Sequence, residues 1–167
     1  MDLLLIQLLY FMAPAYLANM APPFLKYWKG WNRPISERWL GSHKTVLGVV
    51  AGISVALTAA GVQASMNWQA SLLPYRDAWP LVGLALGGGA MFGDALKSLI
   101  KRARGIAPGQ RWVPADQLDF VLGSLLFSAP LVNLAWSDIA IIAGVSFAGD
   151  IAVNHAAFAL GIRDTNW

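Results

Sequence analysis

Residues 79–104 read WPLVGLALGGGAMFGDALKSLIKRAR, an apolar run that passes directly into a cluster of basic residues. The surrounding uncharged run, residues 78–93, is about 24 Å long as a helix, shorter than the roughly 30 Å hydrocarbon core of a bilayer. The segment can therefore span a membrane only if the helix continues through Asp94 and Lys97, with both side chains facing protein or water. The sequence predicts such a helix, with charged residues at one end of the span.

The composition of the whole chain also indicates a membrane protein. Of its 167 residues 57% are hydrophobic and 13% are charged, which is about half the charged fraction of a soluble domain. The chain has no cysteine, which excludes disulfides, thiolate catalysis and cysteine-based zinc sites. Its two histidines, His43 and His155, are far apart, so a His-rich metal cluster is not expected. We expect one domain, residues 1–167, because no long polar linker divides the chain.

Four further segments complete a prediction of five transmembrane helices. The first lies between Asp2 and Lys26, where the alternative is a signal peptide; the absence of a basic n-region argues against that alternative. The others are about 45–64, 117–136 and 138–160, the last interrupted by Asp150. We therefore predict an all-α, polytopic membrane protein in which cytoplasmic loops form a polar site. A bundle this thin favours a homodimer.

The positions of the basic residues predict the orientation. Of the 12 Lys and Arg residues, all except Arg76 fall on one side of a five-span bundle. Because basic loops remain on the cytoplasmic side, we expect a cell-membrane protein whose N-terminus lies outside and whose polar site faces the cytoplasm. The net charge of +3 is then explained by a basic surface next to the membrane or by an anionic substrate, rather than by nucleic acid.

Residues 93–120 contain most of the side chains with which chemistry is expected. Asp94, Lys97 and Lys101 are three and four residues apart, so they share a helix face, and Ser98 and Arg102 adjoin them. The helix thus places a carboxylate near the membrane surface and a dense group of cations after it. For any single basic residue, a purely topogenic role is about as expected as a chemical one.

Two more carboxylates stand at the start of the fourth predicted span. We expect Asp116 to cap that helix and Asp119 to lie one turn inside it, on the same face. An unpaired carboxylate in a span is costly, so its presence usually marks a site. With Asp94, these residues offer hard oxygen ligands for Mg²⁺ beside substrate phosphates. Carboxylates next to a cationic cluster favour a polyphosphate substrate with Mg²⁺.

A second basic segment, residues 22–45, contains interleaved tryptophans that we interpret as membrane anchors. Lys44 and Thr45, at the entry of the second span, could reach a phosphate, although GSHKT lacks the upstream glycine of a P-loop. For Asp150 three roles stay open: a partner for a cation, a cavity wall or a structural contact. For His155 we expect a packed or interfacial position.

Five short strings, spread over most of the chain, are similar to those of a known family. They are P-A-Y-x-A-N at 14–19, G-x-H-K-T at 41–45, G-D-x-x-K-S-x-x-K-R at 93–102, P-G at 108–109 and D-Q-x-D-F-x-x-G at 116–123. Together they resemble the CDP-archaeol synthases, which are related to the CDP-diacylglycerol synthases. The string at 93–102 is the most specific of the five.

The resemblance implies a CTP-dependent cytidylyltransferase of membrane phospholipid biosynthesis. Such an enzyme transfers CMP from CTP to 2,3-di-O-geranylgeranylglyceryl phosphate, giving CDP-archaeol and pyrophosphate, with Mg²⁺ as cofactor. By this resemblance Asp94, Asp116 and Asp119 would be the catalytic and metal-binding carboxylates. The implied binding residues are Lys97, Ser98, Lys101 and Arg102 for the triphosphate, and Asn19, Lys26, Lys44 and Thr45 for the nucleotide or lipid phosphate.

Three alternatives are weighed against this interpretation. Phosphatidic acid could replace the isoprenoid ether lipid, because nothing in the sequence distinguishes ether from ester linkages. A CDP-alcohol phosphotransferase is disfavoured, because its D-x-x-D-G-x-x-A-R string is absent. A small transporter with Asp119 and Asp150 in its path is disfavoured by the lack of an internal repeat and by the cations gathered at one interface. The partners expected are therefore CTP, a lipid phosphate and membrane lipids.

Overall fold

Five α-helices make up the part of the chain that a computed structural model describes, residues 2–107 and 110–161 without the side chains of Asp2 and Lys26. No strand occurs in these two ranges. The helices are α1 (Asp2–Phe24), α2 (Val46–Met66), α3 (Tyr75–Ala103), α4 (Ala115–Ser128) and α5 (Trp136–Ala159), with a short 3-10 helix, η1 (Leu25–Tyr27), after α1. The prediction of an all-α protein is confirmed.

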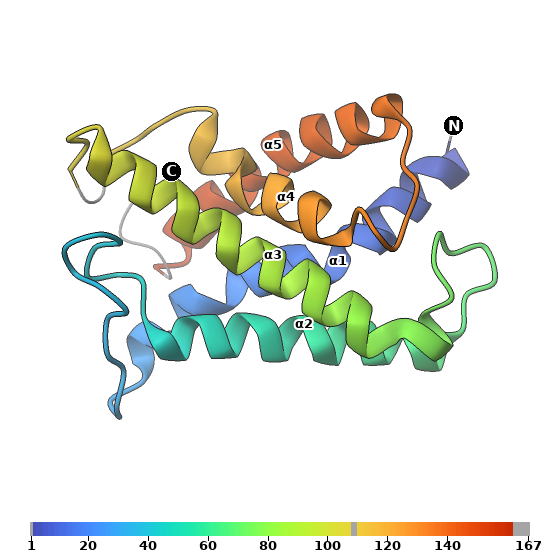
Figure 1. The fold of residues 1–167 in the computed structure, drawn as a ribbon, viewed down its shortest axis with the longest axis horizontal. Helices are drawn as coiled ribbons and strands as arrows, with labels where there is room; N and C mark the ends of the chain where they lie inside the picture. Colours follow the sequence, from blue (N-terminus) through green and yellow to red (C-terminus); the bar gives the residue numbers. More distant parts are fainter. Residues whose placement is uncertain (1, 108–109, 162–167) are drawn as a thin grey trace.

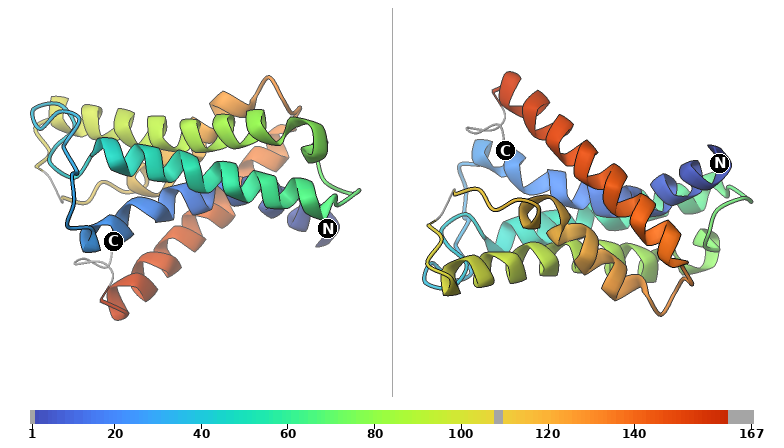
Figure 2. Two further views of the ribbon diagram at one scale, coloured as in Figure 1. Left: turned by 90° about the horizontal axis from the view of Figure 1, so that it is seen from below. Right: turned by 90° about the horizontal axis from the view of Figure 1, so that it is seen from above.

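The helices run alternately between the two ends of the molecule (Figure 1). α3 lies between α2 and α4 and packs along both, while α1 packs across α2 and α3. α5 crosses the bundle obliquely, and its C-terminal turns stand away from α3 in both views of Figure 2. Because the number of helices is odd, α1 begins at one end of the bundle and α5 finishes at the other, as the sequence predicted.

Three of the described helices are long and apolar enough to cross a membrane: Leu3–Phe24 within α1, α2, and α5. α3 is long enough, and it continues through Asp94 and Lys97 as predicted, but it carries charges. α4 has 14 residues and is about 21 Å long. A membrane protein is therefore confirmed, and the count of five spans stays a prediction.

The predicted limits of two spans need correction. A helix was expected to reach Trp136, but α4 ends at Ser128, because Pro130 has no N–H to donate and disfavours helical backbone before it. The amide of Leu131 instead donates to the Ser128 carbonyl at 2.8 Å, which turns the chain. The expected interruption at Asp150 is absent: α5 is continuous, and the amide nitrogen of Asn154 donates to the Asp150 carboxylate at 2.8 Å.

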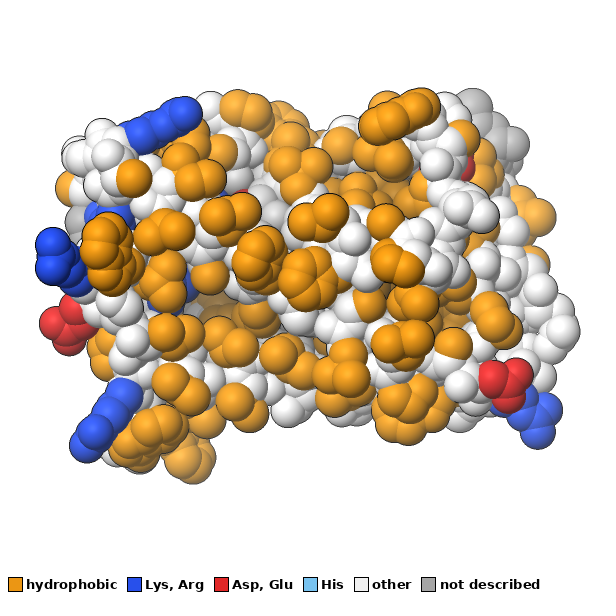
Figure 3. All heavy atoms as spheres, viewed as in Figure 1, with side chains coloured by type: hydrophobic (Ala, Val, Ile, Leu, Met, Phe, Trp, Pro, Cys, Tyr) orange, Lys and Arg blue, Asp and Glu red, His pale blue; other side chains and the backbone are white. Residues whose placement is uncertain are grey.

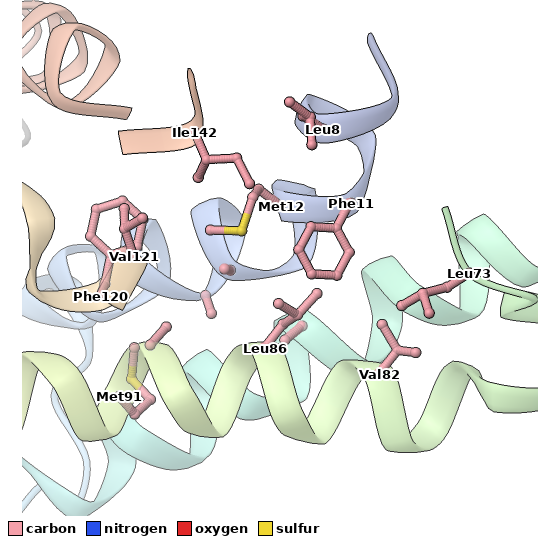
Figure 4. Packing of buried hydrophobic residues seen from close by; sticks show 14 of the residues in the cluster. Leu8, Phe11, Met12, Leu73, Val82, Leu86, Met91, Phe120, Val121 and Ile142 are labelled. Atoms are coloured by element: carbon pink, nitrogen blue, oxygen red, sulfur yellow. The ribbon is translucent and has the colours of Figure 1, made fainter. Parts of the chain in front are cut away.

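The core lies where α1, α3, α4 and α5 meet. Phe11 and Met12 of α1, Leu86 of α3, Val121 of α4 and Ile142 of α5 are buried, and their side chains point toward one another (Figure 4). Lipid chains are as apolar as these side chains, so burial from water contributes little inside a bilayer. Dense packing and dispersion contacts therefore hold this core together.

Glycines bring α3 and α4 into backbone contact. A Cβ atom on Gly93 would lie 2.0 Å from the carbonyl oxygen of Asp119, and one on Gly123 would lie 2.1 Å from that of Gly89. No side chain fits at these positions, as is common where membrane helices approach closely. The contact places the C-terminal half of α3 against the first turns of α4, and hence Asp94 near Asp119.

Candidate active site

The ionisable side chains gather at one end of the bundle. On the face drawn in Figure 3, Lys and Arg side chains cluster at the end where α2 begins and α3 finishes, and hydrophobic side chains cover the middle. Arg76 and Asp77 lie in the first turn of α3, at the opposite end. The described basic side chains on this face thus lie as the sequence predicted, whereas Arg163 is outside the described residues. The assignment of the basic end to the cytoplasm stays a prediction.

The ammonium group of Lys97 lies among three carboxylates from two helices. Its Nζ atom is 3.2 Å from Oδ1 of Asp94, 3.3 Å from Oδ1 of Asp116 and 2.6 Å from Oδ2 of Asp119. The side chain of Lys97 is 15% exposed and that of Asp119 only 4%. The three carboxylates chosen from the sequence therefore converge, and each is paired with a cation, as buried charges require.

Two more lysines flank this group. Nζ of Lys44 pairs with Oδ2 of Asp94. Nζ of Lys101 lies 3.0 and 3.2 Å from the two oxygens of Asp116 and also donates to the carbonyl of Gln110. We call these six side chains the charge cluster: Lys44, Asp94, Lys97, Lys101, Asp116 and Asp119. Their formal charges cancel, so the cluster buries paired charges rather than a net charge.

A short backbone pairing positions Lys44 at the start of α2. The amide of Ile35 donates to the Lys44 carbonyl at 2.8 Å, and the amide of Val46 donates to the Arg33 carbonyl at 3.0 Å. The hydroxyl of Thr45 accepts from the amide of Gly48 at 3.0 Å and caps the helix. Thr45 thus holds the entry of α2 in place, and its predicted contact with a phosphate stays a prediction.

Asp116 does not cap α4, in contrast to the sequence-based expectation. The N-cap residue is Pro114, which has no side chain that can accept a hydrogen bond. Asp116 lies in the first turn, where Oδ2 accepts from the backbone amide of Trp112 at 2.6 Å. The segment before the helix folds back toward this carboxylate, so Asp116 binds a preceding amide and stays available to Lys97 and Lys101.

The other predicted residues are placed less directly at the cluster. The Ser98 hydroxyl donates to the backbone carbonyl of Asp94 at 2.9 Å. Nε of Arg102 is buried and has no hydrogen-bond partner among the described residues. Asn19 lines a cavity between α1 and α5, and the side chain of Lys26 lies outside the described part of the chain. Of the eight predicted binding residues, Lys44, Lys97 and Lys101 belong to the charge cluster.

The cavity between α1 and α5 bears on the role of Asp150, for which the sequence left three roles open. It has a volume of about 240 Å³, and Asn19, Asp150 and Asn154 are its polar lining residues. Asp150 therefore lines a cavity. His155 is exposed, and its Nδ1 lies 2.8 Å from the carbonyl of Ile151 one turn earlier, in agreement with an interfacial position.

Sequence reasoning missed three residues near the cluster. Gln110 contributes its backbone carbonyl to Lys101, and Trp112 contributes its amide to Asp116 while its ring lies 5.0 Å from the guanidinium of Arg104. Gln117 is 1% exposed. Backbone acceptors leave no trace in residue identity, but Gln117 stands inside the string D-Q-x-D-F, where a buried amide next to carboxylates was a usable signal.

The three carboxylates have the donor chemistry of a magnesium site but not its arrangement. Carboxylate oxygens are the ligands that Mg²⁺ prefers, and it commonly binds through one or two carboxylates plus substrate phosphates. Among the described residues, no three acidic or histidine side chains form a preformed metal cage. The carboxylates surround the Lys97 ammonium instead, and the predicted binding of Mg²⁺ by Asp94, Asp116 and Asp119 stays a prediction.

Comparisons with known proteins identify the family to which the chain is similar. The family model described as CarS-like, CDP-archaeol synthase, matches residues 1–167. A CDP-archaeol synthase of Saccharolobus islandicus is 34% identical over 99% of this chain and 97% of that protein. One from Methanosphaerula palustris is 34% identical over 93% of this chain and 100% of that protein. A solved structure, described as an intramembrane enzyme for archaeal membrane lipids biosynthesis, is similar with a TM-score of 0.72 and 28% identity, covering 87% of this chain and 91% of that one.

Proposed function

The chain belongs to the CarS-like family of CDP-archaeol synthases, and we propose that its charge cluster is the site of CMP transfer from CTP to a lipid phosphate. Members of this family are CTP-dependent lipid-phosphate cytidylyltransferases, and the chain is an enzyme of this class. One observation carries the assignment of the site: Lys97 lies within 3.3 Å of carboxylates from both α3 and α4.

The reaction needs charge neutralisation and alignment more than it needs a base. The phosphate of the acceptor is already an anionic nucleophile at neutral pH, so no histidine or cysteine has to remove a proton. An acceptor oxygen forms a bond to the α-phosphorus of CTP, and the bond from that phosphorus to the bridging oxygen breaks as pyrophosphate leaves. Residues that hold both phosphates in line and neutralise the leaving group lower the barrier.

Each part of the charge cluster has a role in this proposal. Lys97 and Lys101 of α3 bind the triphosphate of CTP. Ser98 directly follows Lys97 and Arg102 directly follows Lys101, so both stand beside this triphosphate site. Lys44 approaches from the start of α2 and contributes a third cation. Asp94, Asp116 and Asp119 hold these cations in place before substrate binds.

Mg²⁺ is the cofactor that this donor chemistry suits, held by Asp94, Asp116 or Asp119 together with phosphate oxygens. Bound there, it would neutralise charge on the triphosphate and the departing pyrophosphate. Asn19 and Thr45 are proposed to contribute to the nucleotide or lipid-phosphate pocket because they stand in the family strings at 14–19 and 41–45. Lys26, which lies between these two strings, is proposed to contribute to the same pocket.

We further propose the natural acceptor and the orientation. The family assignment favours an unsaturated isoprenoid ether lipid, 2,3-di-O-geranylgeranylglyceryl phosphate, over phosphatidic acid. The excess of Lys and Arg at the end that contains the charge cluster favours a cytoplasmic site, where CTP is available, with the N-terminus outside. Single cysteines near Arg76 and near Arg104 should then react with impermeant labels from opposite faces of a sealed membrane.

The experiment that tests the proposal is pyrophosphate release by the purified protein in detergent. The reaction contains CTP, Mg²⁺ and either geranylgeranylated glyceryl phosphate or phosphatidic acid. We expect release that depends on Mg²⁺, is faster with the isoprenoid lipid, and falls by about 10² to 10³ in Asp119→Asn.

Asp119→Asn keeps the shape of the side chain, so its thermal unfolding should remain cooperative. Near-normal turnover in this variant would remove Asp119 from the site. A folded wild-type protein that releases no pyrophosphate with either lipid would reject the proposal.

A further inference from the structure

A groove between α3 and α4 opens beside the charge cluster. It has a volume of about 230 Å³ and follows one face of α3, at Phe92, Leu96 and Ile100, and the facing turns of α4, at Leu122 and Leu126. Leu96 is 42% exposed and Leu122 is 57% exposed. We call this groove the α3–α4 groove. Its walls are apolar and partly exposed at the surface of the bundle. In a membrane enzyme, that surface contacts lipid chains.

Two members of the charge cluster, Lys97 and Asp119, line the same groove. Their ion pair, 2.6 Å between Nζ and Oδ2, is the charged part of an otherwise mostly apolar lining. A charged side chain in hydrocarbon costs several kcal/mol by itself, so it normally faces a polar ligand or water. A molecule with a phosphate head and an apolar chain would contact both the charged and the apolar parts of the groove.

We infer that the α3–α4 groove binds the isoprenoid chain of the acceptor lipid phosphate next to its head group, with the phosphate at Lys97. The inference rests on the proposed function and adds the route by which the acceptor reaches the site, sideways from the bilayer. The groove is smaller than the roughly 300–1,000 Å³ of a pocket that encloses a whole ligand. It therefore holds the first part of the chain, and the remainder stays among the lipids.

The cavity between α1 and α5 has nearly the same volume but different chemistry. Its described lining residues include Asp150 and no Lys or Arg, and none of them belongs to the charge cluster. The described lining of that cavity is thus separate from the three lysines to which the proposed function assigns phosphate binding. Because Lys97 and Asp119 line the α3–α4 groove directly, this groove is the better place for the acceptor phosphate and the chain next to it.

Photo-crosslinking of the wild-type protein tests the inference without relying on turnover. The probe is geranylgeranylated glyceryl phosphate with a diazirine in the isoprenoid unit next to the ether oxygen, bound in detergent without CTP. After irradiation and peptide mapping, we expect adducts within residues 92–100 and 122–126. Adducts confined to α1 and α5 would overturn the inference in favour of the other cavity, and adducts spread evenly over all helices would mean non-specific contact and reject it.

Kinetics of matched variants provide the second test. Leu96→Trp and Leu122→Trp narrow the groove, so we expect the KM for the isoprenoid acceptor to rise about tenfold and the KM for CTP to stay within about twofold. Leu84→Trp, at an exposed position of α3 outside the groove, and Val153→Trp, in the α1–α5 cavity, are the controls. Both controls should keep the wild-type KM values.

The outcomes separate the two proposals. If the groove variants keep the acceptor KM of an active wild-type enzyme, or if Val153→Trp raises it more, the groove assignment fails while the cytidylyltransferase stands. If the wild type releases no pyrophosphate, the proposed function fails, and the crosslinking result alone decides whether the groove binds a lipid phosphate. A groove variant that does not fold is replaced by the other one.

Discussion

The two ends of the bundle bury polar side chains in different ways. Where α2 begins and α3 finishes, charged side chains bind one another, as when Lys97 contacts carboxylates of α3 and α4. At the opposite end, neutral side chains bind backbone carbonyls: the amide nitrogen of Gln63 donates to Tyr10 at 2.5 Å and that of Gln7 donates to Ala70 at 2.6 Å. The neutral side chains thus join helices through backbone carbonyls, whereas the charged side chains join α3 and α4 mainly through ion pairs with one another.

The largest effect is expected for Lys97, at the end of the bundle where α2 begins and α3 finishes. Lys97→Met removes the cation that three carboxylates share, and breaking a buried ion pair in this way costs about 3–5 kcal/mol. We expect both a large drop in unfolding temperature and loss of pyrophosphate release. Thermal unfolding in detergent measures the drop in unfolding temperature, and the pyrophosphate-release assay measures the loss of turnover.

Lys97→Arg is the matched control, because it keeps the charge but not the compact ammonium. It should recover most of the stability and little of the turnover. If Lys97→Met unfolds like the wild type, the carboxylates are not held by this lysine, and the contrast between the two ends disappears.

Lys44 should show a smaller effect on catalysis. Replacing it by Met removes its charged contact with Asp94, and hydrogen bonds to charged groups contribute about 1.5–3 kcal/mol. We expect the KM for CTP to rise about 10- to 100-fold, since 1.4 kcal/mol corresponds to a factor of ten.

Lys29→Met, in the same basic segment but exposed, should leave the KM unchanged. Equal effects at Lys29 and Lys44 would mean that the segment acts only through its total charge.

The contact between α3 and α4 supports a prediction about stability. In Gly93→Ala the new methyl group would lie 2.0 Å from the carbonyl oxygen of Asp119, and such overpacking costs about 1–3 kcal/mol. The helices must separate, so we also expect slower turnover.

Gly88→Ala, on the same helix with nothing within 4 Å of the added carbon, should be neutral or stabilising by up to about 1 kcal/mol. Denaturant midpoints of the two variants compare them. A Gly93→Ala protein as stable as Gly88→Ala would contradict the close approach.

The smallest effect is expected at the opposite end of the bundle, where Gln63 and Gln7 bind backbone carbonyls. Gln63→Leu removes the hydrogen bond to Tyr10, and such bonds contribute about 0.6–2 kcal/mol in membrane proteins. We expect a modest decrease in unfolding temperature with unchanged turnover.

Ser65→Ala, whose hydroxyl binds only within its own helix, is the control and should shift stability by less than about 0.5 kcal/mol. Loss of activity in Gln63→Leu would show that the end of the bundle that contains Gln63 also takes part in function.

Much of the fold was predictable because its signals are local. Uncharged runs and their lengths located α1, α2 and α5, and the i, i+3 and i+4 spacing placed Asp94, Lys97 and Lys101 on one face of α3. The end of α4 was predicted too far along the chain, because hydropathy continues past Ser128 while Pro130 ends the helix. Backbone geometry outweighed composition there.

The sequence by itself determined that the chain is an all-α membrane protein with carboxylates and cations gathered at one end. These properties follow from desolvation cost and helical period, which depend on neighbours in sequence. Only the tertiary structure decided that Lys97 is shared by three carboxylates, that Lys44 joins them from the segment before α2, and that Asn19 lines a separate cavity. Those outcomes depend on how closely α3 approaches α4 at Gly93 and Gly123, which is a matter of packing between distant segments.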